Sequence, residues 1–152
     1  MKTGISVADA MTTKTITATK NLSLQAAAKI MRQHDIASLP ISDNGKIIGI
    51  VTDEDLVHKA IAEAMDLKKT QIREIMRTEL VTIAPDKDIY DALKLMKERG
   101  VKRLPVFEGK KMVGFLTLKD ILKIEPQLFD LIVEKYELRE ESNKPIYGSY
   151  PE

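Results

Sequence analysis

The sequence predicts a mixed α+β fold made of two copies of one β-α-β-β-α unit. Residues 11–56 are followed by a related stretch at 76–121, offset by 65 positions without a gap. Within each copy the apolar period switches between that of a strand and that of a helix. A period of 65 is longer than the roughly 20 to 50 residues of solenoid and propeller repeats. We therefore expect two units packed around a pseudo-twofold axis, followed by a C-terminal helix.

Each unit is expected to begin with a short strand and an amphipathic helix. Residues 15–17 are the strand candidate of copy one, and Asn21 is a suitable N-cap for the helix that follows. Asp86 is the corresponding cap of copy two. Met11, Met31, Met76 and Met96 recur with the repeat, so we interpret them as core packing. The predicted buried helix faces, at helical spacing, are Leu24, Ala27, Ala28 and Met31 in copy one, and Ile89, Ala92, Leu93 and Met96 in copy two.

A hairpin and a second helix complete each unit. In copy one, residues 39–41 and 46–51 flank Asn44-Gly45, and this dipeptide is the strongest short signal for a hairpin. In copy two the turn contains Gly109 without the Asn-Gly pair. The second helices are predicted at 53 to about 65 and at 118 to about 124.

The repeat also sets the predicted boundaries. Unit one spans 5–65 and unit two spans 66–123, of which 66–75 is a polar connector expected on the surface. Residues 124–152 comprise a helix starting at Pro126 and running to about residue 141, then a flexible tail. The apolar face of that helix either covers the monomer or pairs with another subunit; it consists of Leu128, Leu131, Ile132 and Tyr136.

Composition excludes several classes of function. The chain of 152 residues has a net charge of +1, so it lacks the broad basic field that drives nucleic-acid binding. No apolar run approaches the ~18 residues of a membrane span, so a soluble cytoplasmic protein is expected. Cysteine is absent, and His34 and His58 lack the spacing of metal ligands. No nucleophile with a base and no Walker-type loop is present, which argues against an enzyme.

A Gly-x-x-Thr-x-x-Asp motif occurs in both copies, at 49–55 and 114–120. It falls where a strand meets a helix, a junction whose free N–H groups favour an anion. Thr52 and Thr117 add a hydroxyl for phosphate, and Asp55 and Asp120 add a carboxylate for ribose hydroxyls. The glycine permits close approach of another backbone. Thr followed three residues later by Asp is also a capping box, which needs no ligand.

The tandem unit resembles a pair of CBS domains, the Bateman module, over about residues 5–123. The resemblance depends on 9–11 and 74–76 at the start of each unit, on the Leu-Pro strands at 39–40 and 104–105, and on both Gly-x-x-Thr-x-x-Asp motifs. It implies a disc-like module that is regulatory and not catalytic. Its two clefts would bind adenosine-containing ligands such as AMP, ADP, ATP or S-adenosylmethionine.

The resemblance also implies the site residues. Asp120 and Asp55 would hold ribose, Thr117 and Thr52 would approach phosphate, and the base would lie against the opposite copy. The first cleft is predicted to contain Thr15, Ile16, Ile36, Lys102, Arg103, Pro105, Thr117 and Asp120. The second cleft is predicted to contain Leu80, Val81, Val101, Ala37, Ser38, Pro40, Thr52 and Asp55.

The two predicted clefts differ in charge. Lys102-Arg103 precede one Leu-Pro pair, whereas Ala37-Ser38 precede the other. Because Arg and Lys both bind phosphate, the Asp120 cleft is expected to favour a phosphorylated ligand. With no output domain in the sequence, regulation would act on a separate protein or through a homodimer. The alternative is a ligand-free module that serves dimerisation or assembly.

Overall fold

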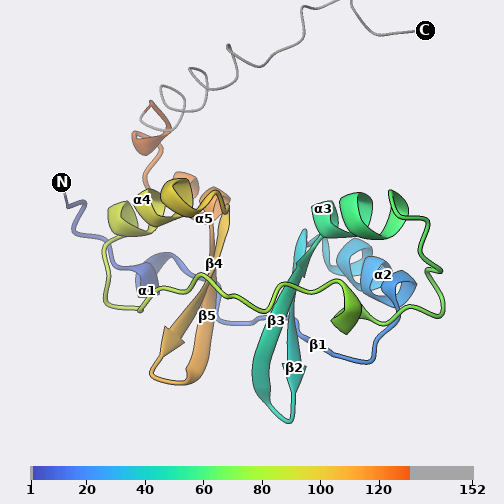
Figure 1. The fold of residues 1–152 in the computed structure, drawn as a ribbon. Coiled ribbons are helices and arrows are strands. Elements are labelled where there is room, and N and C mark those ends of the chain that lie inside the picture. Colours follow the sequence, from blue (N-terminus) through green and yellow to red (C-terminus); the bar gives the residue numbers. More distant parts are fainter. Residues whose placement is uncertain (1, 131–152) are drawn as a thin grey trace, which may run out of the picture.

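The computed structural model describes residues 2–130 and has the predicted mixed α+β fold, but within these residues no strand of copy two precedes its first helix. Figure 1 shows two halves side by side, each with a hairpin flanked by helices. The helices are α1 Val7–Ala10, α2 Leu24–His34, α3 Asp53–Asp55, α4 Ile89–Arg99 and α5 Leu118–Ile124, with a π-helix at Leu56–Ile61 and a 3-10 helix at Ile72–Glu74. The strands are β1 Ala18–Thr19, β2 Ser38–Asp43, β3 Lys46–Thr52, β4 Arg103–Glu108 and β5 Lys111–Thr117.

The two hairpins confirm the repeat. β2 pairs with β3 and β4 pairs with β5, both antiparallel, and both ladders change register at equivalent points. Asn44 and Gly45 have φ values of 50° and 78°, as the predicted two-residue turn requires. Gly109 has a φ of 62° in the turn of copy two. Parallel pairing of Ala18 with Ile41 in copy one recurs as a single bridge between Ile83 and Val106.

The first strand and the helix caps differ from the prediction. Strand β1 begins at Ala18, so the prediction of a strand at 15–17 was wrong. The N-caps are Ser23 and Asp88, and not Asn21 and Asp86. Both predicted caps lie two residues too early. The side chains that accept the N–H groups of the first turn are those directly before Leu24 and Ile89.

The second helix of copy one is only briefly α-helical. It begins at Asp53 as predicted, but it becomes a π-helix at Leu56 and ends at Ile61, short of the predicted residue 65. In copy two, α5 spans Leu118–Ile124 as predicted. π-Helical turns are rare insertions in α-helices, and the apolar period does not reveal them.

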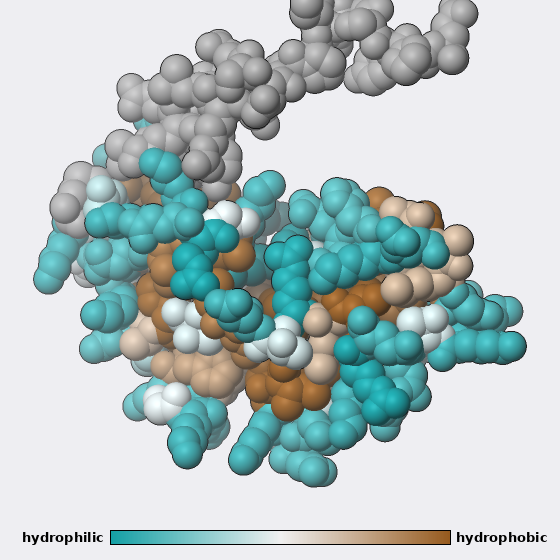
Figure 2. Space-filling view, viewed as in Figure 1, coloured by the Kyte–Doolittle hydropathy of each residue, from teal (hydrophilic) through white to brown (hydrophobic). Residues whose placement is uncertain are grey.

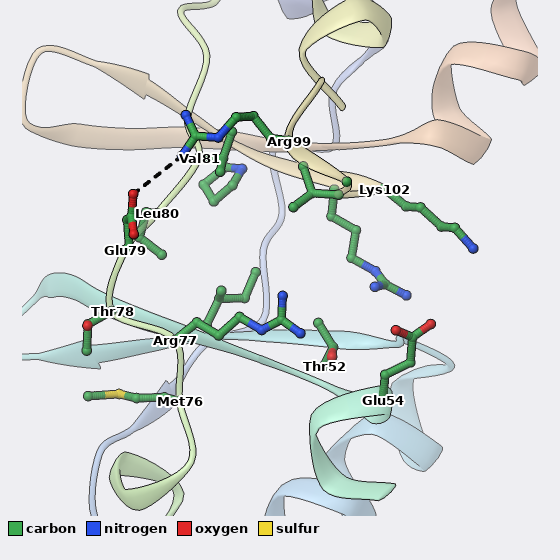
Figure 3. Close-up of a pocket in the computed structure, with 15 residues that line it drawn as sticks. Thr52, Glu54, Met76, Arg77, Thr78, Glu79, Leu80, Val81, Arg99 and Lys102 are labelled. Atoms are coloured by element: carbon green, nitrogen blue, oxygen red, sulfur yellow. Dashed lines mark hydrogen bonds and ion pairs between the residues drawn. The ribbon is translucent and has the colours of Figure 1, made fainter. Parts of the chain in front are cut away.

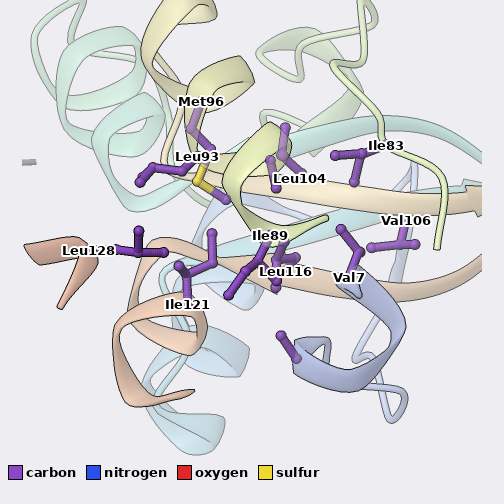
Figure 4. Packing of buried hydrophobic residues seen from close by; sticks show 12 residues of the cluster. Val7, Ile83, Ile89, Leu93, Met96, Leu104, Val106, Leu116, Ile121 and Leu128 are labelled. Atoms are coloured by element: carbon purple, nitrogen blue, oxygen red, sulfur yellow. The ribbon is translucent and has the colours of Figure 1, made fainter. Parts of the chain in front are cut away.

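Each half has its own hydrophobic core, completed by a segment that precedes the other copy's repeat. Val7 and Ala10 belong to the cluster of copy two, where Figure 4 shows Val7 beside Val106. Ile72 and Ile75 belong to the cluster of copy one and are 0% and 3% exposed. The surface connector predicted at 66–75 was therefore wrong for its last residues. The boundaries at 65 and 123 stay predictions.

Backbone pairing joins the exchanged segments to the hairpins. Thr12 and Phe115 exchange two hydrogen bonds of 2.9 Å, and Ile50 and Arg77 exchange bonds of 3.0 and 2.9 Å. This pairing explains the glycine of each motif. A Cβ at Gly49 would lie 2.7 Å from the Met76 sulfur and 3.0 Å from the Arg77 carbonyl, and Gly114 is equally crowded by Met11. The close approach that these glycines permit is therefore made by the chain itself.

Asp88 ties the N-terminal segment to copy two. Its carboxylate accepts hydrogen bonds from the Tyr90 and Gly4 amides at 2.8 and 2.9 Å, and from the amide and hydroxyl of Thr3 at 2.9 and 2.8 Å. Burial raises the pKa of Asp88, but these hydrogen bonds outweigh it and lower the pKa from 3.8 to about 2. One side chain thus caps α4 and anchors Thr3 and Gly4.

We expect Asp88→Ala to lower the free energy of unfolding by about 1 to 2 kcal/mol at neutral pH, because it removes a cap and an anchor. Since the folded pKa is depressed, the carboxylate stabilises the fold above about pH 4 and loses this effect as the pH falls toward 2. Urea unfolding across this range tests the prediction. Asp88→Asn is the control, because asparagine still caps but does not titrate. If Asp88→Ala were as stable as wild type at pH 7, the prediction would be contradicted.

The surface of copy one carries exposed apolar side chains. Val57 and Ile61 lie four residues apart on the π-helix and are 51% and 61% exposed. In the view of Figure 2, hydrophobic residues show in the middle of the face and hydrophilic residues cover most of its rim.

No helix within residues 2–130 is long and apolar enough to span a membrane. Leu128 is 3% exposed within the copy-two core, whereas 131–152, including most of the predicted tail helix, lie outside the described residues.

Candidate functional site

Two cavities lie between the halves of the molecule. The larger, here called the Asp120 cavity, measures about 700 Å³ and takes its lining from both copies. Its apolar wall includes Ile16, Ile36, Pro40 and Phe115. Its charged and polar lining residues are Thr12, Lys14, Thr15, His34, Asp35, Ser38, Lys102, Arg103, Thr117, Lys119 and Asp120.

Thr117 and Asp120 reach this cavity from the junction of β5 and α5. The Thr117 hydroxyl accepts from the Asp120 amide at 3.1 Å, and Asp120 Oδ2 accepts from the Thr117 amide at 2.9 Å. This is the capping box that the sequence allowed as a ligand-free explanation. No ion pair joins Asp120 to a cation within residues 2–130, and its Oδ1 makes no hydrogen bond there. Asp120 therefore lines the cavity, and one of its carboxylate oxygens is free to accept further hydrogen bonds.

The smaller cavity, here called the Thr52 cavity, measures about 520 Å³. Figure 3 shows Leu80 and Val81 on one wall and Arg77 extending across the floor toward Thr52. Arg99 at its edge is paired with Glu79 at 3.4 Å. The other charged lining residues are Glu54, Lys102 and Arg103.

Asp55 does not line the Thr52 cavity, although its repeat equivalent lines the other one. It forms the same capping box with Thr52 and is 1% exposed. Its Oδ1 accepts from Nε and Nη2 of Arg77 at 3.0 and 2.9 Å, and Lys59 Nζ lies 3.5 Å away. Burial raises the pKa of Asp55. The hydrogen bonds from the Thr52 amide and Arg77 and the charges of Arg77 and Lys59 together outweigh burial, so the pKa lies below its ordinary value.

The structure places seven of the eight residues predicted for the Asp120 cleft in one cavity and four of the eight predicted for the other cleft in the second, and it exchanges four residues between the two cavities. Asp120 shares its cavity with Thr15, Ile16, Ile36, Lys102, Arg103 and Thr117, as predicted. Thr52 shares its cavity with Leu80, Val81 and Val101. The corrections are Pro105, which lines the Thr52 cavity, and Ala37, Ser38 and Pro40, which line the Asp120 cavity. Each cavity is lined by both copies, and its Leu-Pro strand comes from the copy opposite its Thr-x-x-Asp motif.

Lys102 and Arg103 line both cavities, so the basic pair does not distinguish the two as the sequence predicted. Arg103 also lies 4.0 Å from Asp53 of the opposite copy. Residues that sequence reasoning missed include Arg77, Lys14 and Lys119. The sequence did contain a sign of Arg77's role. At the 65-residue offset Met76 matches Met11, but the next residue changes from Thr12 to Arg77.

The described residues offer no obvious metal centre. Within residues 2–130 no three or more His, Asp or Glu side chains converge as metal ligands. His34 and His58 are both exposed, as predicted for lone surface histidines.

Known proteins are similar to this chain in sequence and in fold. The CBS domain family model matches residues 7–62 and 72–126. The CBS domain-containing protein YhcV of Bacillus subtilis (strain 168) is 35% identical over 116 residues, which make up 76% of this chain and 82% of YhcV. Protein MK0525 of Methanopyrus kandleri is 36% identical over 107 residues, or 69% of this chain and 55% of MK0525.

A solved structure gives the same fold with ligands. The CBS domain pair of protein MJ0100, solved in complex with 5′-methylthioadenosine and S-adenosyl-L-methionine, superposes with a TM-score of 0.72. It is 34% identical, and the match covers 79% of this chain and 94% of that one. The sequence and fold comparisons thus agree on one module.

Proposed function

Because this chain belongs to the CBS domain family, we propose that it is a non-enzymatic regulatory protein whose Asp120 cavity binds an adenosine-containing ligand. The candidates are AMP, ADP, ATP and S-adenosylmethionine, and the expected location is the cytoplasm. The MJ0100 domain pair supports this class, since it was solved with two adenosine-containing molecules. The ligand acts here as a regulatory effector and undergoes no chemistry.

The observation that carries the proposal is the state of Asp120. Its Oδ2 accepts from the Thr117 amide, which orients the carboxylate, and its Oδ1 has no hydrogen-bond partner among residues 2–130, while the residue itself lines the cavity. The two vicinal hydroxyls of a ribose can donate hydrogen bonds to such an oxygen, and these bonds are charge-assisted because the acceptor is ionised. A fixed acceptor also loses little conformational freedom on binding.

The rest of the Asp120 cavity matches the two ends of a nucleotide. Ile16, Ile36 and Pro40 provide apolar surface for a flat base. Lys102, Arg103 and Lys119 provide positive charge for phosphate or for the carboxylate of S-adenosylmethionine. Because base-side and charge-side residues come from different copies, a bound ligand connects the two halves. It shifts their packing only by its difference in affinity for the two arrangements.

Thermal unfolding of the full chain tests this proposal with AMP, ADP, ATP and S-adenosylmethionine. At 100 times its dissociation constant, one of them should add about 2.7 kcal/mol to the free energy of unfolding. We expect Asp120→Ala to abolish that increment, each protein being compared with its own ligand-free state. The control is Asp86→Ala, which removes an exposed carboxylate outside both cavities. An increment that survives Asp120→Ala would refute the ribose contact.

The second candidate function is a ligand-free module for self-association. The observation that favours it is the pair of exposed apolar residues Val57 and Ile61 on one helical face. Light scattering in the same ligand series separates the candidates. Absence of any thermal increment, together with a stable oligomeric mass, would favour assembly over ligand sensing.

A further inference from the structure

The two copies of the Thr-x-x-Asp motif are chemically different once folded. Arg77 places two N–H donors on Asp55 Oδ1, at 3.0 and 2.9 Å, while the Thr52 amide occupies Oδ2 at 3.0 Å. Lys59 adds positive charge 3.5 Å from the same Oδ1. Both oxygens of Asp55 are therefore engaged by the chain itself.

The repeat supplies a matched comparison for this arrangement. Thr12 stands where Arg77 stands, and Ile124 stands where Lys59 stands, so neither cation of the Asp55 site has a counterpart near Asp120. Both Thr12 and Arg77 pair their backbones with the neighbouring hairpin in the same way. The difference between the two sites thus comes from side chains on equivalent backbones.

We infer that Arg77 closes the Asp55 site to ribose, so that the Asp120 cavity is the adenosine site of each chain. The inference rests on the proposed function, and it assigns to Arg77 the role of limiting each chain to one ligand-binding site. A ribose that used Asp55 would have to displace a guanidinium from a carboxylate that is 1% exposed. Exchanging the hydrogen bonds of an ion pair, in which both partners are charged, for bonds from neutral hydroxyls to the same carboxylate weakens binding by roughly ten- to a hundredfold.

The decisive variant is Arg77→Thr, which gives copy two the residue that copy one carries at the equivalent position. Calorimetric titration with AMP, ADP, ATP and S-adenosylmethionine in turn should give one site per wild-type chain for the ligand that binds. Arg77→Thr should give two. Arg77→Lys, which keeps a cation beside Asp55, should still give one. Adding Asp55→Asn to Arg77→Thr should remove the new site and return the count to one.

The outcomes separate this inference from the proposed function. Two sites per wild-type chain, or one site in a folded Arg77→Thr variant, would overturn the inference and leave the proposed function standing. No binding by wild type or variant would overturn both. If Arg77→Thr does not fold, Arg77→Met keeps the aliphatic stem without the guanidinium and is judged by the same counts. Circular dichroism establishes folding before each titration.

Discussion

Ile72→Ala is expected to lower the free energy of unfolding by about 2 to 5 kcal/mol, the range for an isoleucine in a well-packed core. The residue belongs to the segment between the two repeats, yet it is fully buried in the cluster of copy one. Its amide also donates to the Leu22 carbonyl at 2.7 Å. Truncation leaves a cavity in a core that this segment completes.

Urea unfolding followed by circular dichroism measures the loss, with Arg73→Ala as the control. Arg73 is the next residue and is exposed, so its removal should change stability by less than about 0.5 kcal/mol. If Ile72→Ala and Arg73→Ala gave equal, small losses, the segment would not be part of the core.

The same packing makes the two halves mutually dependent. The segment that contains Val7 completes the core of copy two, and the segment that contains Ile72 completes the core of copy one. Each segment also adds an edge pairing to the hairpin that it covers, through Thr12 and Arg77. A chain that ended after the first repeat would therefore lack Ile72 and Ile75 in its core. The repeat as it stands in the sequence is not the unit of packing.

Local patterns predicted the parts of the fold that depend on local interactions. Asn44-Gly45 placed the first hairpin because its φ values are a property of those two residues. The caps were missed by two residues because Asn21 and Ser23, or Asp86 and Asp88, are all capable caps, and tertiary packing selects the helix start.

The sequence predicted which types of residue line the site, but it did not predict which copy's Leu-Pro strand lines which cavity. The motif placed Thr117 and Asp120 at a cavity, but each cavity draws its Leu-Pro strand from the opposite copy, and periodicity carries no such information. The burial of Asp55 beneath Arg77 depends on a residue 22 positions away. The alignment of Arg77 with Thr12 held that signal, since it sets a guanidinium against a hydroxyl directly after the matching residues Met76 and Met11.

Asp55→Ala is expected to destabilise the ligand-free protein by about 2 to 4 kcal/mol, against about 1 kcal/mol for Asp120→Ala. Both changes remove a capping box, which contributes roughly 1 kcal/mol. Asp55 alone also accepts two charge-assisted hydrogen bonds from Arg77, and because the Arg77 side chain is 49% exposed, solvent screening limits the two bonds together to about 1 to 3 kcal/mol. Urea unfolding at neutral pH measures the difference, and equal losses would contradict a structural role for the Asp55–Arg77 pair.

Acidification provides an independent check on this pair. Because the folded pKa of Asp55 lies below its ordinary value, the carboxylate stabilises the fold above about pH 4, and this stabilisation is lost as the pH falls through the folded pKa. The stability gap between wild type and Asp55→Ala should therefore narrow in acid, with Asp55→Asn separating the cap from the charge. A gap that stays constant with pH would mean that packing, and not the ionised carboxylate, makes Asp55 important.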